Sequence, residues 1–174
     1  MKQNILEWTK TIAISIIIAL IITTFVRPTL VMQYSMHPTI EEHDYLLVNK
    51  IAYKFKKIKF GDIIVFESQL KTEEGKNKQL IKRVIGLPGD VLEIKDGVVY
   101  RNGEALEEPY INGDYTSGSL GATEIPESKL FVMGDNRPSS VDSRSSEVGT
   151  VSEDNVMGKV LIRLYPFNKI GFVQ

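Results

Sequence analysis

Ser35 and Lys82 are two residues that together could carry out chemistry on a peptide bond. A serine hydroxyl attacks a carbonyl carbon only when a neighbouring group accepts its proton. Ser35 lies in the run V-M-Q-Y-S-M-H-P-T, from Val31 to Thr39. Lys82 lies in the apolar run Q-L-I-K-R-V-I-G, from Gln79 to Gly86. A serine nucleophile served by a lysine base is therefore one chemistry that these two segments allow.

The two histidines of the chain are the alternative bases. His37 is two residues from Ser35, and in an extended segment their side chains would lie on the same side but about 7 Å apart. His43 lies in the polar run E-E-H-D, which is typical of an exposed turn. Surface positions explain both histidines, so lysine is the favoured base.

A lysine base must be neutral at the working pH. With a reference pKa near 10.4, holding a lysine neutral at pH 7 costs about 4.6 kcal/mol. Burial among apolar side chains disfavours the ammonium form and can supply this cost during folding. Lys82 has such neighbours in Leu80, Ile81, Val84 and Ile85. The alternative, which the sequence leaves open, is a solvent-facing lysine on a strand.

A third segment, from Gly134 to Arg144, is unusually rich in polar groups. Its sequence, G-D-N-R-P-S-S-V-D-S-R, holds two acids, two arginines and three serines directly after an apolar run. One interpretation is a polar turn with surface ion pairs. The other is a group of side chains that orients the serine and the lysine from behind.

The element that would hold this chemistry in place is an apolar N-terminal segment. The 16 residues from Thr11 to Val26 are uncharged and rich in isoleucine. A helix from Trp8 to Val26 has 19 residues and is about 28 Å long, close to the thickness of the hydrocarbon core of a bilayer. We therefore expect a tail over residues 1–8, a transmembrane helix over 9–27 and a separate domain over 28–174, while the few flanking charges leave the orientation open.

The ends of the apolar segment agree with a membrane span. Trp8 and Lys10 lie at one end and Arg27 at the other, where aromatic rings and long cationic side chains suit the interface. A buried core helix is disfavoured because every face is apolar and the remaining chain is small. A cleaved signal peptide is disfavoured because R-P-T-L, not a small-residue cleavage site, follows Val26.

The rest of the chain reads as short strands and tight turns. Asp96-Gly97 and Asn102-Gly103 suit two-residue turns, and residues 107–129 predict a long irregular connection. Connections this short favour antiparallel pairing, so the fold class is mainly β. Val91–Tyr100 is predicted to form a hairpin, and the other runs of strand type are Tyr45–Val48, Asp62–Glu67, Gln79–Ile85, Leu130–Met133 and Val156–Leu164.

Composition excludes several classes of function. The net charge is −1, which gives no footprint for nucleic acid. The chain has no cysteine, so it has no disulfide, no thiolate metal ligand and no cysteine nucleophile. The basic stretch Y-K-F-K-K-I-K-F, from Tyr53 to Phe60, is interpreted as a solvated edge, with a patch for anionic lipid headgroups as the alternative.

Three segments resemble the sequence boxes of the bacterial type I signal peptidases, which remove signal peptides from exported proteins. S-M-H-P-T resembles the family's S-M-x-P-T nucleophile box, K-R-V-I-G-L-P-G-D its lysine box, and the Gly134 to Arg144 segment its C-terminal box. The resemblance covers nearly the whole chain, and the short length is similar to the compact Gram-positive form. It implies a transmembrane helix followed by an antiparallel β catalytic domain of the signal peptidase and self-cleaving repressor type.

The resemblance also implies what the two principal residues do. Ser35 would be the nucleophile and Lys82 the general base of a membrane-anchored serine endopeptidase. The enzyme would form an acyl-enzyme and cut signal peptides with small residues at the first and third positions before the bond. It would need no metal and no organic cofactor.

Supporting roles follow from the same resemblance. Ser140 would hydrogen-bond the lysine amine, and Asp142 and Arg144 would form a supporting ion pair. Asp135 and Arg83 would pair and brace the lysine strand.

Gln33 is where the chain departs from the pattern. Many compact members have V-x-G-x-S-M where this chain has V-M-Q-Y-S-M, and some other members have a serine at the position of Gln33 that helps to bind the oxyanion. Our hypothesis is that the Gln33 amide donates to the oxyanion beside the Ser35 backbone N–H. The alternatives are that Gln33 only faces solvent, or that its bulk narrows the cleft.

The expected partners are signal-peptide-bearing preproteins and the lipid bilayer, with no nucleic acid. The protein would be a monomer that spans the bacterial cell membrane once, with its N-terminus in the cytoplasm. A second hypothesis is a membrane-anchored accessory module on the same fold that has lost catalysis. A third is a serine-lysine peptidase akin to the self-cleaving repressors, which carry a DNA-binding domain where this chain has an apolar segment.

Overall fold

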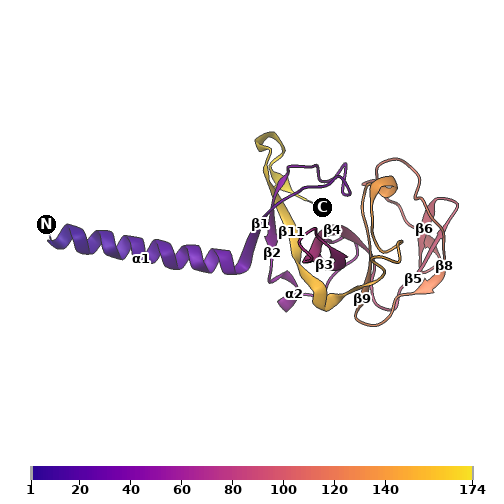
Figure 1. The fold of residues 1–174 in the computed structure, drawn as a ribbon, viewed down its shortest axis with the longest axis horizontal. Helices are drawn as coiled ribbons and strands as arrows, with labels where there is room; N and C mark the ends of the chain where they lie inside the picture. Colours follow the sequence, from indigo (N-terminus) through magenta and orange to yellow (C-terminus); the bar gives the residue numbers. More distant parts are fainter. Residues whose placement is uncertain (1, 174) are drawn as a thin grey trace.

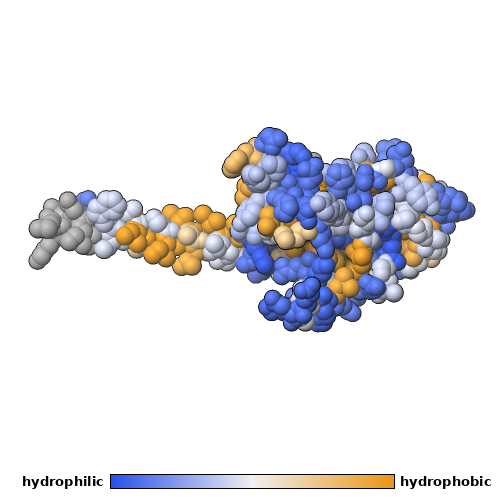
Figure 2. All heavy atoms as spheres, turned by 45° about the horizontal axis from the view of Figure 1, so that its top comes forward, coloured by the Kyte–Doolittle hydropathy of each residue, from blue (hydrophilic) through white to orange (hydrophobic). Residues whose placement is uncertain are grey.

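A long N-terminal helix projects from a β-rich domain (Figure 1). The protein is described from a computed structural model, which covers residues 2–173. The helix, α1 (Lys2–Phe25), contains a 19-residue span from Glu7 to Phe25 that is long and apolar enough to cross a membrane. None of this span is buried by the rest of the protein, and Figure 2 shows apolar residues along it.

The end of α1 is set by a proline. A proline disfavours helical backbone angles in the residue before it, so Pro28 pushes Arg27 into an extended conformation. The helix accordingly ends at Phe25, and Val26 and Arg27 belong to the first strand instead of the transmembrane segment to which we assigned them. The Lys50 amide donates to the Phe25 carbonyl at 2.9 Å, which ties the helix end to the domain.

The larger sheet has eight strands and carries the site. Seven lie in the order β1-β2-β11-β3-β4-β9-β10, and β12 pairs with β11. Every neighbouring pair is antiparallel, which confirms the mainly β, antiparallel class. The strands are β1 (Val26–Leu30), β2 (Tyr45–Asn49), β3 (Ile63–Lys71), β4 (Asn77–Gly86), β9 (Lys129–Met133), β10 (Val151–Ser152), β11 (Val156–Tyr165) and β12 (Gly171–Phe172).

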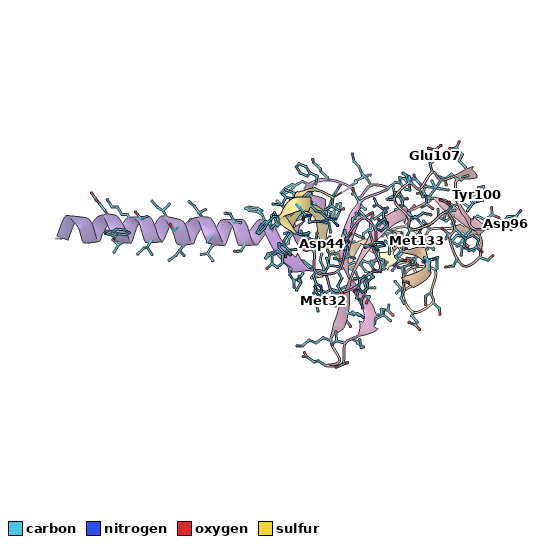
Figure 3. All side chains as sticks on the ribbon, turned by 90° about the horizontal axis from the view of Figure 1, so that it is seen from above. Met32, Asp44, Asp96, Tyr100, Glu107 and Met133 are labelled. Carbon is cyan, nitrogen blue, oxygen red and sulfur yellow. The ribbon has the colours of Figure 1, made fainter. Side chains whose placement is uncertain are left out.

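The smaller sheet lies at the end of the domain remote from α1, where Asp96 and Tyr100 are labelled in Figure 3. Its strand order is β7-β6-β5-β8. Asp96 and Gly97 both have positive φ, as the two-residue turn between β5 and β6 requires. The strands are β5 (Val91–Lys95), β6 (Val98–Arg101), β7 (Glu104–Ala105) and β8 (Leu120–Glu124).

Two parts of the fold differ from the sequence expectation. The connection over residues 107–129 contains a strand, β8, although its residues are mostly exposed and it has no apolar alternation. The basic stretch contains a single helical turn, α2 (Ala52–Phe55), where no helix was expected. The other short turns are 3-10 helices: η1 (Arg137–Ser139), η2 (Glu153–Asn155) and η3 (Phe167–Lys169).

Three apolar clusters hold the domain together. One contains Met36 and Ile40, which fix the segment after Ser35 against β2, β3 and β11. The second packs Phe66 of β3 against β4 and β9. The third joins the two sheets through Met133, Ile85 and residues of β5. The strand of Lys82 therefore has packed side chains on both of its faces.

Candidate active site

Ser35 lies in the turn that leaves β1 and leads towards β2. The residues on either side of this turn are tied together, since the Val31 amide donates to the Asp44 carbonyl at 3.0 Å and the His43 amide donates to the Val31 carbonyl at 2.8 Å. Met36, directly after the serine, is fully buried. The serine is thus held in a closed loop with an anchored neighbour.

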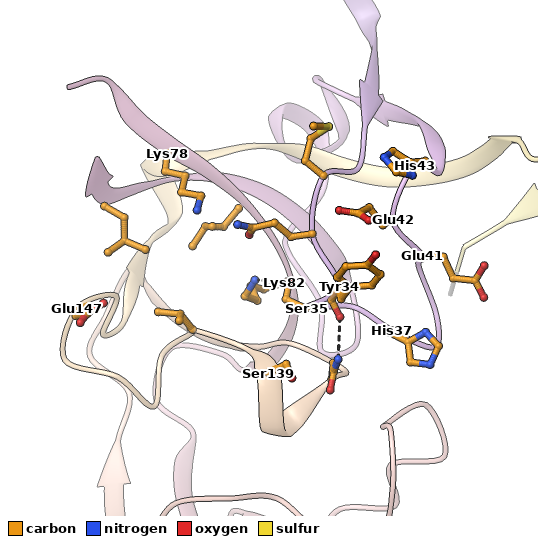
Figure 4. A pocket seen from close by; sticks show the side chains of 16 residues that line it. Tyr34, Ser35, His37, Glu41, Glu42, His43, Lys78, Lys82, Ser139 and Glu147 are labelled. Carbon is orange, nitrogen blue, oxygen red and sulfur yellow. Dashed lines mark hydrogen bonds between the residues drawn. The ribbon is translucent and has the colours of Figure 1, made fainter. Parts of the chain in front are cut away.

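A second segment grips the backbone of this turn. The Asn136 amide donates to the Ser35 carbonyl at 3.0 Å, and the Asn136 side chain donates to the Tyr34 carbonyl at 3.1 Å (Figure 4). A Cβ atom on Gly134 would lie 2.3 Å from that same Ser35 carbonyl oxygen. Glycine is therefore needed at position 134 for the two segments to approach.

Lys82 is the hydrogen-bond partner of the Ser35 hydroxyl. It lies on β4, its Nζ is 2.8 Å from Ser35 Oγ, and it is 1% exposed. Nζ also donates to the Ile81 carbonyl at 3.0 Å. The 2.8 Å separation fits both directions of the bond, including the one in which the hydroxyl donates to a neutral amine.

Burial controls the protonation of this lysine. It lowers the pKa of Lys82 to about 8, and the positive charges of Lys78 and Arg144 act in the same direction. The carboxylates of Asp142 and Asp135 oppose the shift but are outweighed. A lysine with this pKa is neutral in a useful fraction of molecules near neutral pH.

Arg83 and Asp135 form a buried ion pair next to Lys82 on the chain. Arg83 Nε and Nη2 lie 2.9 and 2.7 Å from the two Asp135 carboxylate oxygens, and the two side chains are 4% and 1% exposed. Thr39 donates to Asp135 at 2.5 Å, and Arg83 also donates to the Gly61 carbonyl at 3.1 Å. The Arg83 guanidinium stacks over the Tyr110 ring at 3.9 Å. The pair ties β3, β4 and the C-terminal box into one unit.

Asp142 and Arg144 form a second pair inside the C-terminal box. Arg144 Nε and Nη2 each lie 2.9 Å from one Asp142 oxygen, and Asp142 also accepts the Gly134 amide at 3.0 Å. Burial acts to raise the pKa of Asp142, but the Arg144 guanidinium and the other donors overcome it and hold that pKa below its usual value. Asp142 is therefore ionised and fixes Gly134 against the Ser35 turn.

Ser140 does not have the partner that the resemblance implies. Among residues 2–173, the contacts of Lys82 Nζ are Ser35 and Ile81. The buried Ser140 Oγ instead helps to lower the pKa of Asp142. Ser140 Oγ lies close to Gly134, at 2.3 Å from where a Cβ atom on that glycine would be.

The histidines lie at the rim of the site. His37 and His43 line the same groove as Ser35, but of the described residues it is Lys82 that bonds the serine hydroxyl. Figure 4 shows His37 and Glu41 to one side of the Ser35 turn, with Lys82 close to the serine. The geometry brings the serine and the lysine together and leaves the histidines outside this contact.

Sequence reasoning missed several residues that build the site. Asn136, Thr39 and Glu108 were given no role, and Arg137 was counted only as one of two arginines. Arg137 is fully buried and pairs with Glu108, with Nη1 and Nη2 at 2.8 and 2.5 Å from its carboxylate oxygens. The signal available was the excess of arginine in a short box, which predicts buried carboxylate partners without saying which.

Two hollows adjoin Ser35. The first is a groove of about 980 Å³ whose lining includes Ser35, Lys82 and Gln33. The second, of about 330 Å³, lies between residues 29–33 and residues 78–81, and it also reaches Ser35. Gln33 lines both hollows, and its side chain is exposed. Within the described residues, no group of three or more His, Asp or Glu side chains is placed to hold a metal ion.

Comparison of the sequence with known proteins shows the family to which the chain belongs. The family model described as "Signal peptidase, peptidase S26" matches residues 5–165. The chain belongs to this signal peptidase family. It is therefore a serine peptidase, a hydrolase of peptide bonds, and the family membership expected from the sequence boxes is confirmed.

Individual signal peptidases match along nearly their whole length. The chain is 37% identical to a signal peptidase I of Bacillus licheniformis over 179 residues, with 97% of this chain and 93% of the relative covered. It is 36% identical to a signal peptidase IB of Staphylococcus aureus over 190 residues, with 99% and 95% covered. A crystal structure of a signal peptidase I from Enterococcus faecalis is 35% identical, with a TM-score of 0.49 and coverage of 60% of this chain and 97% of that one.

The buried pair behind the site gives a prediction about stability. Replacing Asp135→Ala leaves the Arg83 guanidinium buried without its counter-charge, which we expect to lower the free energy of unfolding by about 3–5 kcal/mol. The measurement is chemical unfolding of the full chain in detergent micelles. Glu74→Ala is the matched control, because Glu74 pairs with Lys76 on the surface, with both side chains more than 70% exposed, and its loss should leave stability almost unchanged. Equal effects of the two substitutions would contradict a structural role for the buried pair.

Proposed function

We propose that this signal peptidase cuts signal peptides from exported preproteins, with Ser35 as the nucleophile and Lys82 as the general base. The observation that carries the proposal is the 2.8 Å contact between Ser35 Oγ and the amine of a buried lysine. A nucleophile within hydrogen-bond reach of a base with a lowered pKa is the arrangement that covalent catalysis needs. Two such groups at the meeting point of two hollows are placed to reach a bound peptide.

The chemistry follows from proton transfer between these groups. Neutral Lys82 accepts the Ser35 proton as Oγ attacks the scissile carbonyl, which gives a tetrahedral oxyanion and a lysine ammonium. The ammonium then protonates the leaving amine, so the C–N bond breaks and the mature protein departs, leaving an acyl-enzyme ester. Lys82, neutral again, takes a proton from water, and the hydroxide so formed attacks the ester carbonyl. The ester C–O bond then breaks, the signal peptide leaves as a carboxylic acid, and the Lys82 ammonium returns its proton to Ser35 Oγ.

The substrate is proposed to bind as an added strand. The ladder between β4 and β9 begins at Arg83, so within residues 2–173 the stretch 78–81 of β4 has no strand partner on that side. These residues face residues 29–33 across the 330 Å³ hollow. An extended peptide can pair there through main-chain hydrogen bonds and place alternate side chains in the hollow. A hollow of this size supports the expectation of small residues at the first and third positions before the cleaved bond.

The supporting residues have proposed positioning roles. Arg83 and Asp135 brace β4 on the residue after Lys82, and Arg144 and Asp142 hold Gly134 against the Ser35 turn. Ser140 is proposed to donate to the lysine amine after a change in its side-chain torsion. Each of these contacts acts on the geometry of the reacting pair, not on the substrate.

The protein is proposed to be a monomer anchored once in the bacterial cell membrane by α1, with residues 1–8 in the cytoplasm and the domain from residue 28 onwards outside it. The apolar, uncovered surface of α1 supports this anchoring. The alternative of a catalytically impaired accessory module is disfavoured, because the serine and a buried lysine are both present and in contact.

The first prediction from the proposed function concerns Ser35 and Lys82. Ser35→Ala and Lys82→Ala should each lower cleavage of a secretory precursor by the full chain in detergent by about 10⁴-fold or more, since each removes an essential group of one chemical unit. Ser152→Ala and Lys95→Ala, which lie outside the groove, are the matched controls and should retain activity. Equal processing by wild type and by both site variants would remove the assignment.

The second prediction is the pH dependence of the reaction. Because only neutral Lys82 can accept the proton, kcat/KM should rise with pH through the lysine pKa of about 8 and then level off. For one titrating base of that pKa, the rise from pH 7 to pH 9 is about tenfold. The test is a rate profile on a precursor from pH 5 to pH 10. A flat profile would contradict a titrating lysine.

The third prediction concerns the oxyanion. Gln33 lines both hollows and is proposed to donate its amide to the oxyanion together with the Ser35 backbone N–H. Gln33→Ala should then lower kcat by about 10²-fold or more with little change in KM, because the donor acts in the transition state. Gln33→Asn and Gln33→Gly separate donation from bulk. If Gln33→Ala turns over at the wild-type rate, the side chain has no such role, and if it turns over faster, its bulk narrows the cleft.

A further inference from the structure

We infer that residues 50–57, named here the basic segment, bind the anionic headgroups of the membrane leaflet from which α1 emerges. The segment carries four lysines and one exposed phenyl ring, and it includes α2. The inference rests on the proposed function in one respect, because it takes α1 as the membrane-spanning helix. It goes further by giving the β domain its own contact with lipid.

The basic segment lies beside the end of α1. Val26, the first residue after the helix, pairs with Asn49 in the register of β1 and β2. Lys50, the first residue of the basic segment, donates its amide to the Phe25 carbonyl at 2.9 Å. Figure 1 shows α2 on the side of the domain from which α1 projects. Wherever α1 leaves the bilayer, the basic segment is therefore at the surface of that bilayer.

Its side chains are held outwards by anchors on each side. Tyr53 is half-buried and donates its hydroxyl to Asp62 at 3.0 Å, and Ile58 is buried just beyond the segment. Between these anchors Lys54, Lys56 and Phe55 are exposed, and Phe55 is 82% exposed. A large aromatic ring held in water between cations is costly in solution. It suits the interface of a membrane, where the ring enters the headgroup region and the cations meet phosphates.

The charge of the segment is available for binding. Lys159, Lys169 and Lys76 each form an ion pair with a carboxylate. Within residues 2–173, the lysines of the segment are in none of the ion pairs formed, and these are Lys50, Lys54, Lys56 and Lys57. Arg27, exposed at the start of β1, adds to the positive charge around the helix end.

Acidic residues limit which side of the segment can meet the membrane. Glu127, Glu153 and Asp154 line the hollow of about 810 Å³ that Lys54, Phe55, Lys56 and Lys57 also line. Anionic headgroups would be repelled by this acidic wall and attracted by the lysine wall. Lipid therefore contacts only the lysine side of the basic segment. Such a contact limits the rotation of the β domain about the axis of α1.

The expected size of the effect comes from surface electrostatics. Each lysine near an anionic membrane strengthens its binding by about fivefold, so removal of three lysines weakens the local contact by roughly 100-fold. This contact is intramolecular once α1 is inserted. It must therefore be detected by a local probe and not by whether the protein sediments with vesicles.

The test places a fluorescent probe on the segment of the full chain in lipid nanodiscs. Trp8 is the only tryptophan, so Phe55→Trp in a Trp8→Phe background gives a single indole. We expect lipids with brominated acyl chains to quench it more strongly in discs containing about a third phosphatidylglycerol than in discs of phosphatidylcholine alone. The triple variant Lys54→Gln, Lys56→Gln and Lys57→Gln should abolish that difference.

Two matched controls accompany this test. Lys71→Gln, Lys76→Gln and Lys95→Gln remove the same charge from exposed sites outside the segment and should keep the difference in quenching. Tyr100→Trp, in the same background, reports on the end of the domain remote from α1 and should be unquenched in both lipids (Figure 3).

The outcomes separate this inference from the proposed function. Quenching at position 55 that is absent, or that is unaffected by phosphatidylglycerol and by the triple variant, overturns the lipid contact even if the protein cleaves its precursor. Quenching at position 55 that is stronger with phosphatidylglycerol, and that loses this difference in the triple variant, supports the contact even if the protein does not cleave its precursor. In the second case it is the proposed function that fails.

Discussion

The removal of one amine from water is the constraint on which the site depends. The carboxylates of Asp142 and Asp135 both favour the ammonium form of Lys82. Each carboxylate has its own arginine: Asp135 is paired with Arg83, and Asp142 with Arg144. Burial outweighs the two carboxylates, and the positive charges of Lys78 and Arg144 act in the same direction as burial, so the pKa of the lysine falls. Arg144 thus lowers this pKa and also holds Asp142 in place.

The same constraint explains why the C-terminal box is so dense in polar groups. Its acids and arginines are buried, and each has to find a partner inside the protein. Gly134 and Asn136 contact the turn at Tyr34 and Ser35, and Arg137 pairs with Glu108. A single short box therefore contacts two distant parts of the chain. A box built in this way is tightly constrained, because a change in any one member leaves a buried group without its partner.

Sequence reasoning could predict the parts of this structure that depend on local pattern. Apolar runs identified the principal strands, and Asp96-Gly97 identified a hairpin by its backbone demands. It could not place β8, which has no apolar alternation and forms because β5 presents a free edge. The grip of Asn136 on the Ser35 turn is a contact between backbone groups about a hundred residues apart, and no spacing in the sequence encodes it. Within the described residues Lys82 Nζ bonds Ser35 and Ile81 and not Ser140, and a motif does not specify the side-chain torsion that decides this.

The short strand β1 sets the distance between α1 and the Ser35 turn. All five of its residues are paired with β2, so the chain between α1 and the Ser35 turn is a rigid connection and not a flexible linker. Five residues of strand extend about 17 Å, and a paired strand does not stretch or coil with thermal motion. The hydroxyl of Ser35 consequently sits at a set offset from Phe25. If α1 spans the membrane as proposed, this fixed distance sets how far from the bilayer a peptide bond must lie to reach Ser35.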